Sequence, residues 1–133
     1  MSNFEDRLLN EWVKHKKLAI ACDFDGTIFV FNSKYEKQEL CDFVIETLLE
    51  AQKLGTLIVI NTASIPERFP FILEYCKEKG IIVEAINKNA IPFPYGNNGK
   101  VYSNIYLDDR AGINEALLIL KNVIIRYKEH LNN

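Results

Sequence analysis

Two aspartates that are two residues apart, Asp23 and Asp25, follow a short apolar run at residues 18–22. Because alternate residues of an extended chain project to the same side, both carboxylates would lie together at the end of a buried strand. Two anions so placed repel each other, and a bound cation is the natural compensation. Gly26 permits a tight turn, and the Thr27 hydroxyl can hydrogen-bond within it. The segment therefore predicts a site that needs a cation.

A second acidic pair, Asp108 and Asp109, follows another apolar run at residues 104–107. The carboxyl ends of parallel strands meet at one edge of a sheet, where the sites of such folds lie. Oxygen ligands from two acidic strand ends suit a hard cation such as Mg²⁺. An Asp-x-Asp-Gly segment alone is also typical of an ordinary exit from a strand into a turn. Two acidic pairs at two strand ends favour the metal site.

Polar residues also follow the apolar run at 57–60, at Asn61, Thr62 and Ser64. A hydroxyl and backbone N–H groups at this edge can hold a phosphate oxygen. Ser64 lies two residues before Pro66 and is equally suited to cap the helix that starts there. Thr62 is the stronger candidate for a ligand of a bound phosphate.

Lys100 comes at the end of a loop rich in proline and glycine, residues 87–100, and before the apolar run at 104–107. From this position its ammonium group could reach the acidic cluster and neutralise it. The alternative is a solvated loop lysine, which is the commonest environment of this residue type. Both interpretations are open from the residues alone.

The elements that must position these groups alternate along the chain. Apolar residues at helical spacing predict helices at 3–15, 36–54, 66–79 and 112–130. Continuous apolar runs predict buried strands at 18–22, 57–60, 81–86 and 104–107. The alternation indicates a three-layer α/β/α Rossmann-like fold, with a parallel sheet and helices on both faces. We expect one domain over residues 1–133, with an N-terminal helical extension at 1–17.

The composition excludes several other classes of protein. The chain has 133 residues and a net charge of -2, so there is no basic excess for nucleic acid or an anionic membrane. No apolar stretch is long enough to form a signal peptide or to cross a bilayer. Three widely spaced cysteines, Cys22, Cys41 and Cys76, fit neither a disulfide framework nor a zinc site. We expect a cytoplasmic protein with reduced cysteines and no membrane partner.

Residues 23–27, Asp-Phe-Asp-Gly-Thr after an apolar strand, resemble the first motif of the haloacid dehalogenase superfamily in its phosphatase form. Thr62, in Ile-Asn-Thr-Ala-Ser, looks like the Ser/Thr of the second motif, and Lys100 looks like the lysine of the third. The Leu-Asp-Asp at 107–109 is similar to the fourth motif. The four motifs occur in the family's order and span residues 18–109.

The resemblance implies the chemistry of a phosphatase. Asp23 would be the nucleophile that accepts the phosphoryl group as an aspartyl phosphate. Asp25 would protonate the leaving oxygen and then activate water. Thr62 and Lys100 would stabilise the phosphoryl group during its transfer. The residues expected to contact the substrate are Gly26, Thr27, Asn61, Thr62, Ala63 and Lys100.

The resemblance also implies a Mg²⁺ cofactor. The ion would lie between the Asp23 carboxylate, the backbone carbonyl of Asp25 and the Asp108 carboxylate. Asp109 would bind it through water or orient the ligands around it. The ion would clamp the phosphoryl oxygens and hold the nucleophile and the substrate together.

The chain looks closest to small members of the superfamily without a cap domain, whose fourth motif is an acid pair followed by Arg, here Arg110. Such members often carry Arg two residues after the second-motif Thr, where this chain has Ser64. Arg68, one helical turn further on, could take its place. The intervals between the motifs are too short to hold a cap domain, so we expect an open site. An open site suits a bulky substrate or a partner subunit that closes it.

The predicted function is Mg²⁺-dependent hydrolysis of a phosphate monoester, carried by a phosphorylated small molecule, a nucleotide or a polynucleotide end. A nucleic-acid 3′-end or nucleotide phosphatase is the more specific alternative, and a catalytically idle relative that binds phosphate and metal is another. A phosphoacceptor receiver domain is disfavoured, because in that fold the acid pair follows the first strand and the phosphoacceptor a middle one. Apolar residues beyond one face of the last helix, Leu118, Ile119 and Ile125, also allow a homodimer.

Overall fold

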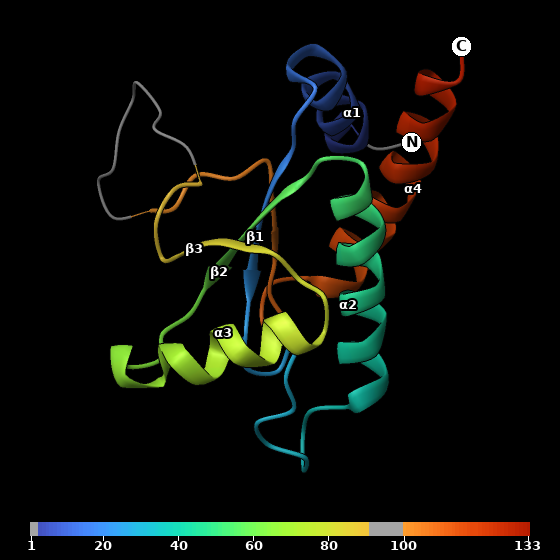
Figure 1. Ribbon diagram of the computed structural model, residues 1–133. Helices are drawn as coiled ribbons and strands as arrows, with labels where there is room; N and C mark the ends of the chain where they lie inside the picture. Colours follow the sequence, from blue (N-terminus) through green and yellow to red (C-terminus); the bar gives the residue numbers. More distant parts are fainter. Residues whose placement is uncertain (1–2, 91–99) are drawn as a thin grey trace.

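The computed structural model of the protein describes residues 3–90 and 100–133 (Figure 1). Its helices are α1 (Asn3–His15), α2 (Gln38–Lys53), α3 (Phe69–Glu78) and α4 (Ile113–Leu131), with a short 3₁₀ helix, η1 (Pro66–Arg68), before α3. Its strands are β1 (Ala19–Asp23), β2 (Leu57–Asn61), β3 (Val83–Ile86) and β4 (Ile105–Leu107). Of the predicted loop at 87–100, residues 91–99 lie outside the described residues.

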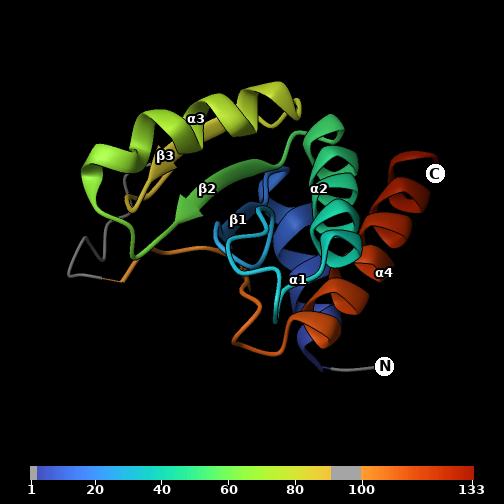
Figure 2. The same cartoon turned by 90° about the horizontal axis from the view of Figure 1, so that it is seen from below.

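The four strands in the described ranges form one parallel sheet in the order β3-β2-β1-β4. The last residue of the central strand β1, Asp23, pairs with Asn61 of β2. On the other side of β1, Cys22 pairs with Leu107, so Asp108 leaves β4 at the level where β1 ends. The β1 arrow points downward in Figure 1, and Figure 2 therefore looks onto the carboxyl ends of the strands. These ends meet at one edge of the sheet, as predicted.

The predicted fold class, a Rossmann-like α/β domain, is confirmed, and no cap domain is evident among the described residues. Two element boundaries differ from the predicted ones for local reasons. The predicted helix at 66–79 begins as a 3₁₀ turn, since Pro70 has no N–H to donate to the carbonyl of Pro66. The predicted strand at 81–86 begins later, because the Ile81 N–H donates to the Cys76 carbonyl and closes the end of α3.

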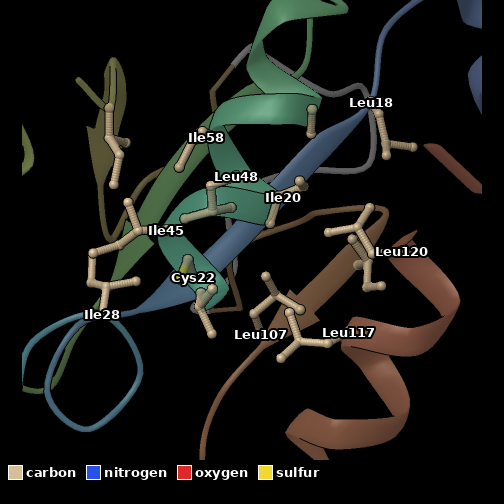
Figure 3. Packing of buried hydrophobic residues seen from close by; sticks show 14 of the residues in the cluster. Leu18, Ile20, Cys22, Ile28, Ile45, Leu48, Ile58, Leu107, Leu117 and Leu120 are labelled. Carbon is tan, nitrogen blue, oxygen red and sulfur yellow. The ribbon is translucent and has the colours of Figure 1, made fainter. Parts of the chain in front are cut away.

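The apolar core lies between one face of the sheet and the helices packed on it (Figure 3). Ile20 and Ile58, from adjacent strands, lie beside Leu48 of α2, and Leu107 of β4 lies beside Leu117 of α4. Each such side chain contributes about 1.5–3 kcal/mol when it is removed from water. The core therefore fixes β1 and β4, the two strands that carry the acidic residues. The three cysteines are buried and unpaired: Cys22, Cys41 and Cys76.

The N-terminal helix α1 packs against α4 and joins the same core. Trp12 stacks on Tyr127, with ring centroids 4.0 Å apart and ring planes inclined by 7°. Arg126 of α4 forms ion pairs with Glu5 and Asp6 of α1, each at 3.0 Å. The helix is thus held by apolar and by charged contacts.

The last helix exposes fewer apolar residues than the sequence suggests. Ile119 is buried within the chain, whereas Leu118 and Ile125 are exposed. Of the three apolar residues of α4 that were expected to be available to a partner, one is therefore buried within the chain. Across the described ranges, none of the helices combines the length and the apolar character that crossing a membrane requires.

Candidate active site

An acidic cluster stands at the carboxyl edge of the sheet. Asp23 ends β1, and Asp108 and Asp109 directly follow β4. One carboxylate oxygen of each lies within 4.8 Å of the others, and all three residues are half-buried. No lysine or arginine of the described residues forms an ion pair with any of them. Three of the four predicted metal ligands thus meet through their carboxylates, and the fourth, Asp25, is predicted to bind through its backbone carbonyl.

Thr27 and Gly26 contact this cluster on the side that faces away from the cleft. The fully buried Thr27 hydroxyl can donate to Asp23 Oδ2 at 3.2 Å or to Asp109 Oδ1 at 3.3 Å, and it accepts the Asp109 N–H at 3.0 Å. Gly26 has a φ of +83°, and a Cβ at this residue would clash with the Asp109 carboxylate. Both residues were predicted to contact substrate, and the structure places them behind the carboxylates instead of on the wall of the cleft.

Replacing Gly26 by Ala is expected to weaken Mg²⁺ binding by about tenfold or more, because Asp109 must move away from the added methyl group. Isothermal titration calorimetry with Mg²⁺ measures this change. Gly112→Ala is the matched control: Gly112 also has a positive φ, of +66°, but open space surrounds its Cβ position. Both variants therefore carry a similar backbone strain. An equal loss of Mg²⁺ affinity in the two would contradict the prediction.

Asp23 has a strongly perturbed acidity. Its burial, and then the nearby charge of Asp108, raise the pKa of Asp23 from its ordinary 3.8 to about 7, against the opposing hydrogen bond from Thr27. Asp109 raises the pKa further. Below about pH 7, ionising Asp23 is thus unfavourable unless positive charge enters the cluster. Half-buried carboxylate oxygens that lack a cationic partner among the described residues fit a hard divalent ion such as Mg²⁺.

The raised pKa predicts how the stability of the metal-free protein depends on pH. The unfolded chain releases the Asp23 proton near pH 3.8 and the folded protein near pH 7, so the folded state holds more protons in between. Stability is therefore lost as pH rises through this window. Solvent screening of the half-buried group reduces the loss to about 1–2 kcal/mol.

Chemical denaturation of the metal-free protein between pH 4 and pH 8 measures this effect. The wild type is compared with Asp23→Asn, which cannot ionise at this residue. We expect Asp23→Asn to gain stability relative to the wild type as pH rises. A stability difference that stays constant over the window would contradict the assigned pKa.

Asp25 is held by Arg68 of η1. Both guanidinium ends donate to the Asp25 carboxylate: Nη2 to Oδ1 at 2.8 Å and Nη1 to Oδ2. Nη1 also donates to the Ser64 hydroxyl at 2.8 Å, and that hydroxyl lies 3.4 Å from Asp25 Oδ2. The Asp25 partner in turn raises the pKa of Arg68. Arg68 thus lies behind Asp25 and Ser64 and is not among the residues that line the cleft, and its charge is directed at Asp25.

The alternative role of Ser64 as a helix cap is wrong. Residue Ile65 occupies the capping position of η1, and no side chain hydrogen-bonds the free N–H groups there. The Ser64 hydroxyl instead joins Arg68 and Asp25, because the 3₁₀ turn places Arg68 above it. Ser64 is thus part of the wall of the candidate site.

Thr62 is fixed by a residue that the sequence did not indicate. The Asn87 side chain accepts the Thr62 N–H at 2.8 Å and donates to the Thr62 carbonyl at 2.9 Å. Asn87 itself has a φ of +56°, a backbone conformation that asparagine tolerates better than most residues. The Thr62 hydroxyl accepts the Ser64 N–H at 3.1 Å. Asn61, predicted to contact substrate, is exposed and does not line the cleft.

A cleft of about 650 Å³ opens above the acidic cluster. Predicted residues line much of it: Asp23, Asp25, Thr62, Ala63, Ser64 and Asp108. The other lining residues are Phe31, Asn32, Glu36 and Arg110, and the sequence suggests a ligand contact only for Phe31, where stacking on a base or aryl group is the alternative to core packing. Three of these come from the segment between β1 and α2, whose path cannot be read from local sequence.

Arg110 follows the acid pair of the fourth motif, and the sequence assigns it no catalytic or binding role. Its side chain forms no ion pair or hydrogen bond with a described residue, so it can meet an anion in the cleft.

Lys100 is not brought to the acidic cluster. It is exposed and does not line the cleft, and its Nζ lies over the ring of Tyr106, 5.1 Å from the centroid. It forms no ion pair with a carboxylate of the described residues. Of the four residues predicted to be catalytic, the structure thus gathers Asp23, Asp25 and Thr62 around the cleft and leaves Lys100 outside it.

No family model matches the chain, and no curated protein matches it either. Among solved structures, the chain is similar to a conserved protein from Bacteroides thetaiotaomicron. The two chains are 28% identical, the similarity covers 71% of this chain and 77% of the other, and the TM-score is 0.57. This similarity supports the overall fold, and the chemistry must be argued from the site itself.

Proposed function

We propose that the protein is a Mg²⁺-dependent phosphate-monoester hydrolase that works through an aspartyl phosphate on Asp23. One observation carries the proposal: three carboxylates without a cationic partner among the described residues meet at the carboxyl edge of the sheet. Two of them, Asp23 and Asp108, line an open cleft together with Asp25 and Thr62. Three such anions have little structural use, because their mutual repulsion destabilises the fold. A divalent ion and a phosphate ester together supply the missing positive charge and the group to be transferred.

Asp23 is the proposed nucleophile. An Asp23 carboxylate oxygen forms a bond to phosphorus while the bond from phosphorus to the leaving oxygen breaks. Thr27, hydrogen-bonded to Oδ2, holds the orientation of the carboxylate. To act as the acid, Asp25 must take up a proton and open its pair with Arg68; it gives that proton to the leaving oxygen and then takes one from the water that hydrolyses the aspartyl phosphate. Inorganic phosphate and free Asp23 result, so the cycle balances.

The Thr62 segment is the proposed phosphate cradle. Thr62, Ala63 and Ser64 line the cleft beside the acidic cluster, and Asn87 fixes the Thr62 backbone from behind. Arg110, on the rim, adds a cation. Asp23, Asp108 and Asp109 would hold Mg²⁺, together with the Asp25 carbonyl. Bound there, Mg²⁺ supplies charge that stabilises the phosphoryl oxygens in the transition state.

The experiment that tests this function is release of inorganic phosphate from a panel of monoesters. The panel includes alkyl and aryl phosphates, nucleoside monophosphates and a 3′-phosphorylated oligonucleotide. We expect turnover with Mg²⁺, loss of at least about a thousandfold in EDTA, and recovery when Mg²⁺ is added back. If Mg²⁺ binds by calorimetry and no ester is hydrolysed, the protein is a binding module and the proposal is wrong.

A further inference from the structure

Phe31 is an exposed aromatic side chain inside the candidate cleft. It lines the cleft while 61% of it remains exposed. The neighbouring rings of Phe24 and Phe29 stack on each other, and Phe24 is fully buried. A ligand that covers this ring removes apolar surface from water, which favours binding.

The segment that carries Phe31 is held in place by hydrogen bonds. Glu36 Oε1 accepts the N–H of Phe31 at 2.7 Å and that of Asn32 at 2.9 Å. The Asn32 carbonyl accepts the N–H groups of Tyr35 and Glu36, at 3.1 and 2.9 Å. Glu36 Oε1 thus holds two backbone N–H groups of the turn and fixes the loop. The exposed ring is thus positioned before any ligand arrives, which reduces the cost of binding one.

Arg68 connects the Phe31 ring to the catalytic acid. The Arg68 guanidinium carbon lies 5.0 Å from the Phe31 ring centroid, within the range of a cation–π contact. The same guanidinium forms the bidentate pair with Asp25. One guanidinium group therefore separates the ring from the carboxylate that would protonate the leaving oxygen. An aryl group on the leaving oxygen that Asp25 protonates would therefore lie near the Arg68 and Phe31 side chains.

We propose that Phe31 is the platform on which a planar aromatic leaving group stacks, and that the preferred substrates are aryl phosphate monoesters. This inference rests on the proposed function. The leaving group of an aryl ester begins at the ester oxygen itself, which suits a ring platform adjacent to the acid. In a nucleotide the sugar intervenes between the base and the phosphate, so its base would extend beyond the ring. No cap domain is evident among the described residues to offer another recognition surface.

The test uses phosphonates that cannot be hydrolysed, so that binding is measured apart from reactivity. Benzylphosphonate and cyclohexylmethylphosphonate have the same charge and similar size, and only the first has a planar aromatic ring. Calorimetry in Mg²⁺ is expected to give a dissociation constant about tenfold to a hundredfold lower for benzylphosphonate. Phe31→Ala and Phe31→Leu should both abolish this preference, since leucine keeps an apolar side chain without a ring.

Tyr35→Ala is the matched control. Tyr35 lies in the same segment and is 75% exposed, but it does not line the cleft. We expect the Tyr35→Ala protein to retain the wild-type preference. An equal affinity of the wild type for both phosphonates overturns the inference, as does an equal effect of the two alanine variants. A nucleoside 5′-phosphonate that depends on Phe31 when benzylphosphonate does not also overturns it.

The two proposals fail in different ways. If neither phosphonate nor inorganic phosphate binds in the presence of Mg²⁺, the phosphate site itself is wrong, and the proposed function fails with the inference. If both phosphonates bind equally and phosphate esters are still hydrolysed, the proposed function stands and only the aromatic platform is overturned.

Discussion

Replacing Asp23 by Asn is expected to reduce phosphate release by about four orders of magnitude or more, because an amide cannot form the aspartyl phosphate. The two side chains have almost the same shape, and the amide oxygen of Asn can still accept the hydrogen bond from Thr27. The loss should therefore appear in kcat and leave the fold intact. Phosphate release under saturating Mg²⁺ and substrate measures it.

The folding of this variant separates chemistry from structure. Asp23→Asn removes one charge from the acidic cluster, so we expect the metal-free variant to be at least as stable as the wild type at neutral pH. Asp42→Asn is the control substitution, since Asp42 is an exposed residue of α2 that neither lines the cleft nor belongs to the acidic cluster. Its activity should stay within about twofold of the wild type. An active Asp23→Asn enzyme would rule out covalent catalysis by this residue.

Replacing Asp25 by Asn is expected to lower kcat by about a hundredfold to ten-thousandfold, since general acid–base catalysis is lost in both steps. The loss should depend on the leaving group. Esters of alkyl alcohols, whose leaving oxygen needs a proton, should suffer most. Esters of acidic phenols should still phosphorylate Asp23 and then stall, because the attack of water also needs Asp25. A pre-steady-state burst of the phenol, with slow turnover afterwards, measures this.

Arg68→Met is the matched control for Asp25. Asparagine also breaks the bidentate pair with Arg68, because its NH₂ group would face a guanidinium donor. Arg68→Met breaks the same pair and keeps the Asp25 carboxylate. If Arg68→Met reproduces the burst and the dependence on leaving group, Asp25 acts by positioning Arg68 and its role as acid and base is wrong.

Much of the fold could be predicted because its signals are local. The apolar runs before Asp23 and Asp108 can be buried only as strands of a covered parallel sheet, and both acids follow from that placement. Gly80, which has a positive φ, follows the end of α3, as the predicted helix at 66–79 requires. The strand order β3-β2-β1-β4 then brings Asp23 beside Asp108, because β1 pairs with β4.

The walls of the cleft could not be predicted in the same way. Phe31 and Glu36 belong to the segment between β1 and α2, whose turn depends on a side-chain carboxylate that accepts two backbone N–H groups. Asn87 holds Thr62 from another strand end, 25 residues away along the chain. Lys100 was expected at the cluster, and its side chain lies over Tyr106. These contacts join residues that no spacing in the sequence relates.

The sequence by itself determined which residues carry charge and hydroxyl groups at the strand ends, because burial requires the apolar runs to be strands and the polar residues to follow them. Only the tertiary structure decided which partner each of those groups binds. The packing of η1 places Arg68 against the Asp25 carboxylate. Thr27 lies behind the acidic residues instead of facing the substrate. The physical reason is that hydrogen bonds and ion pairs depend on distances of a few ångströms, which are set by how separate elements pack.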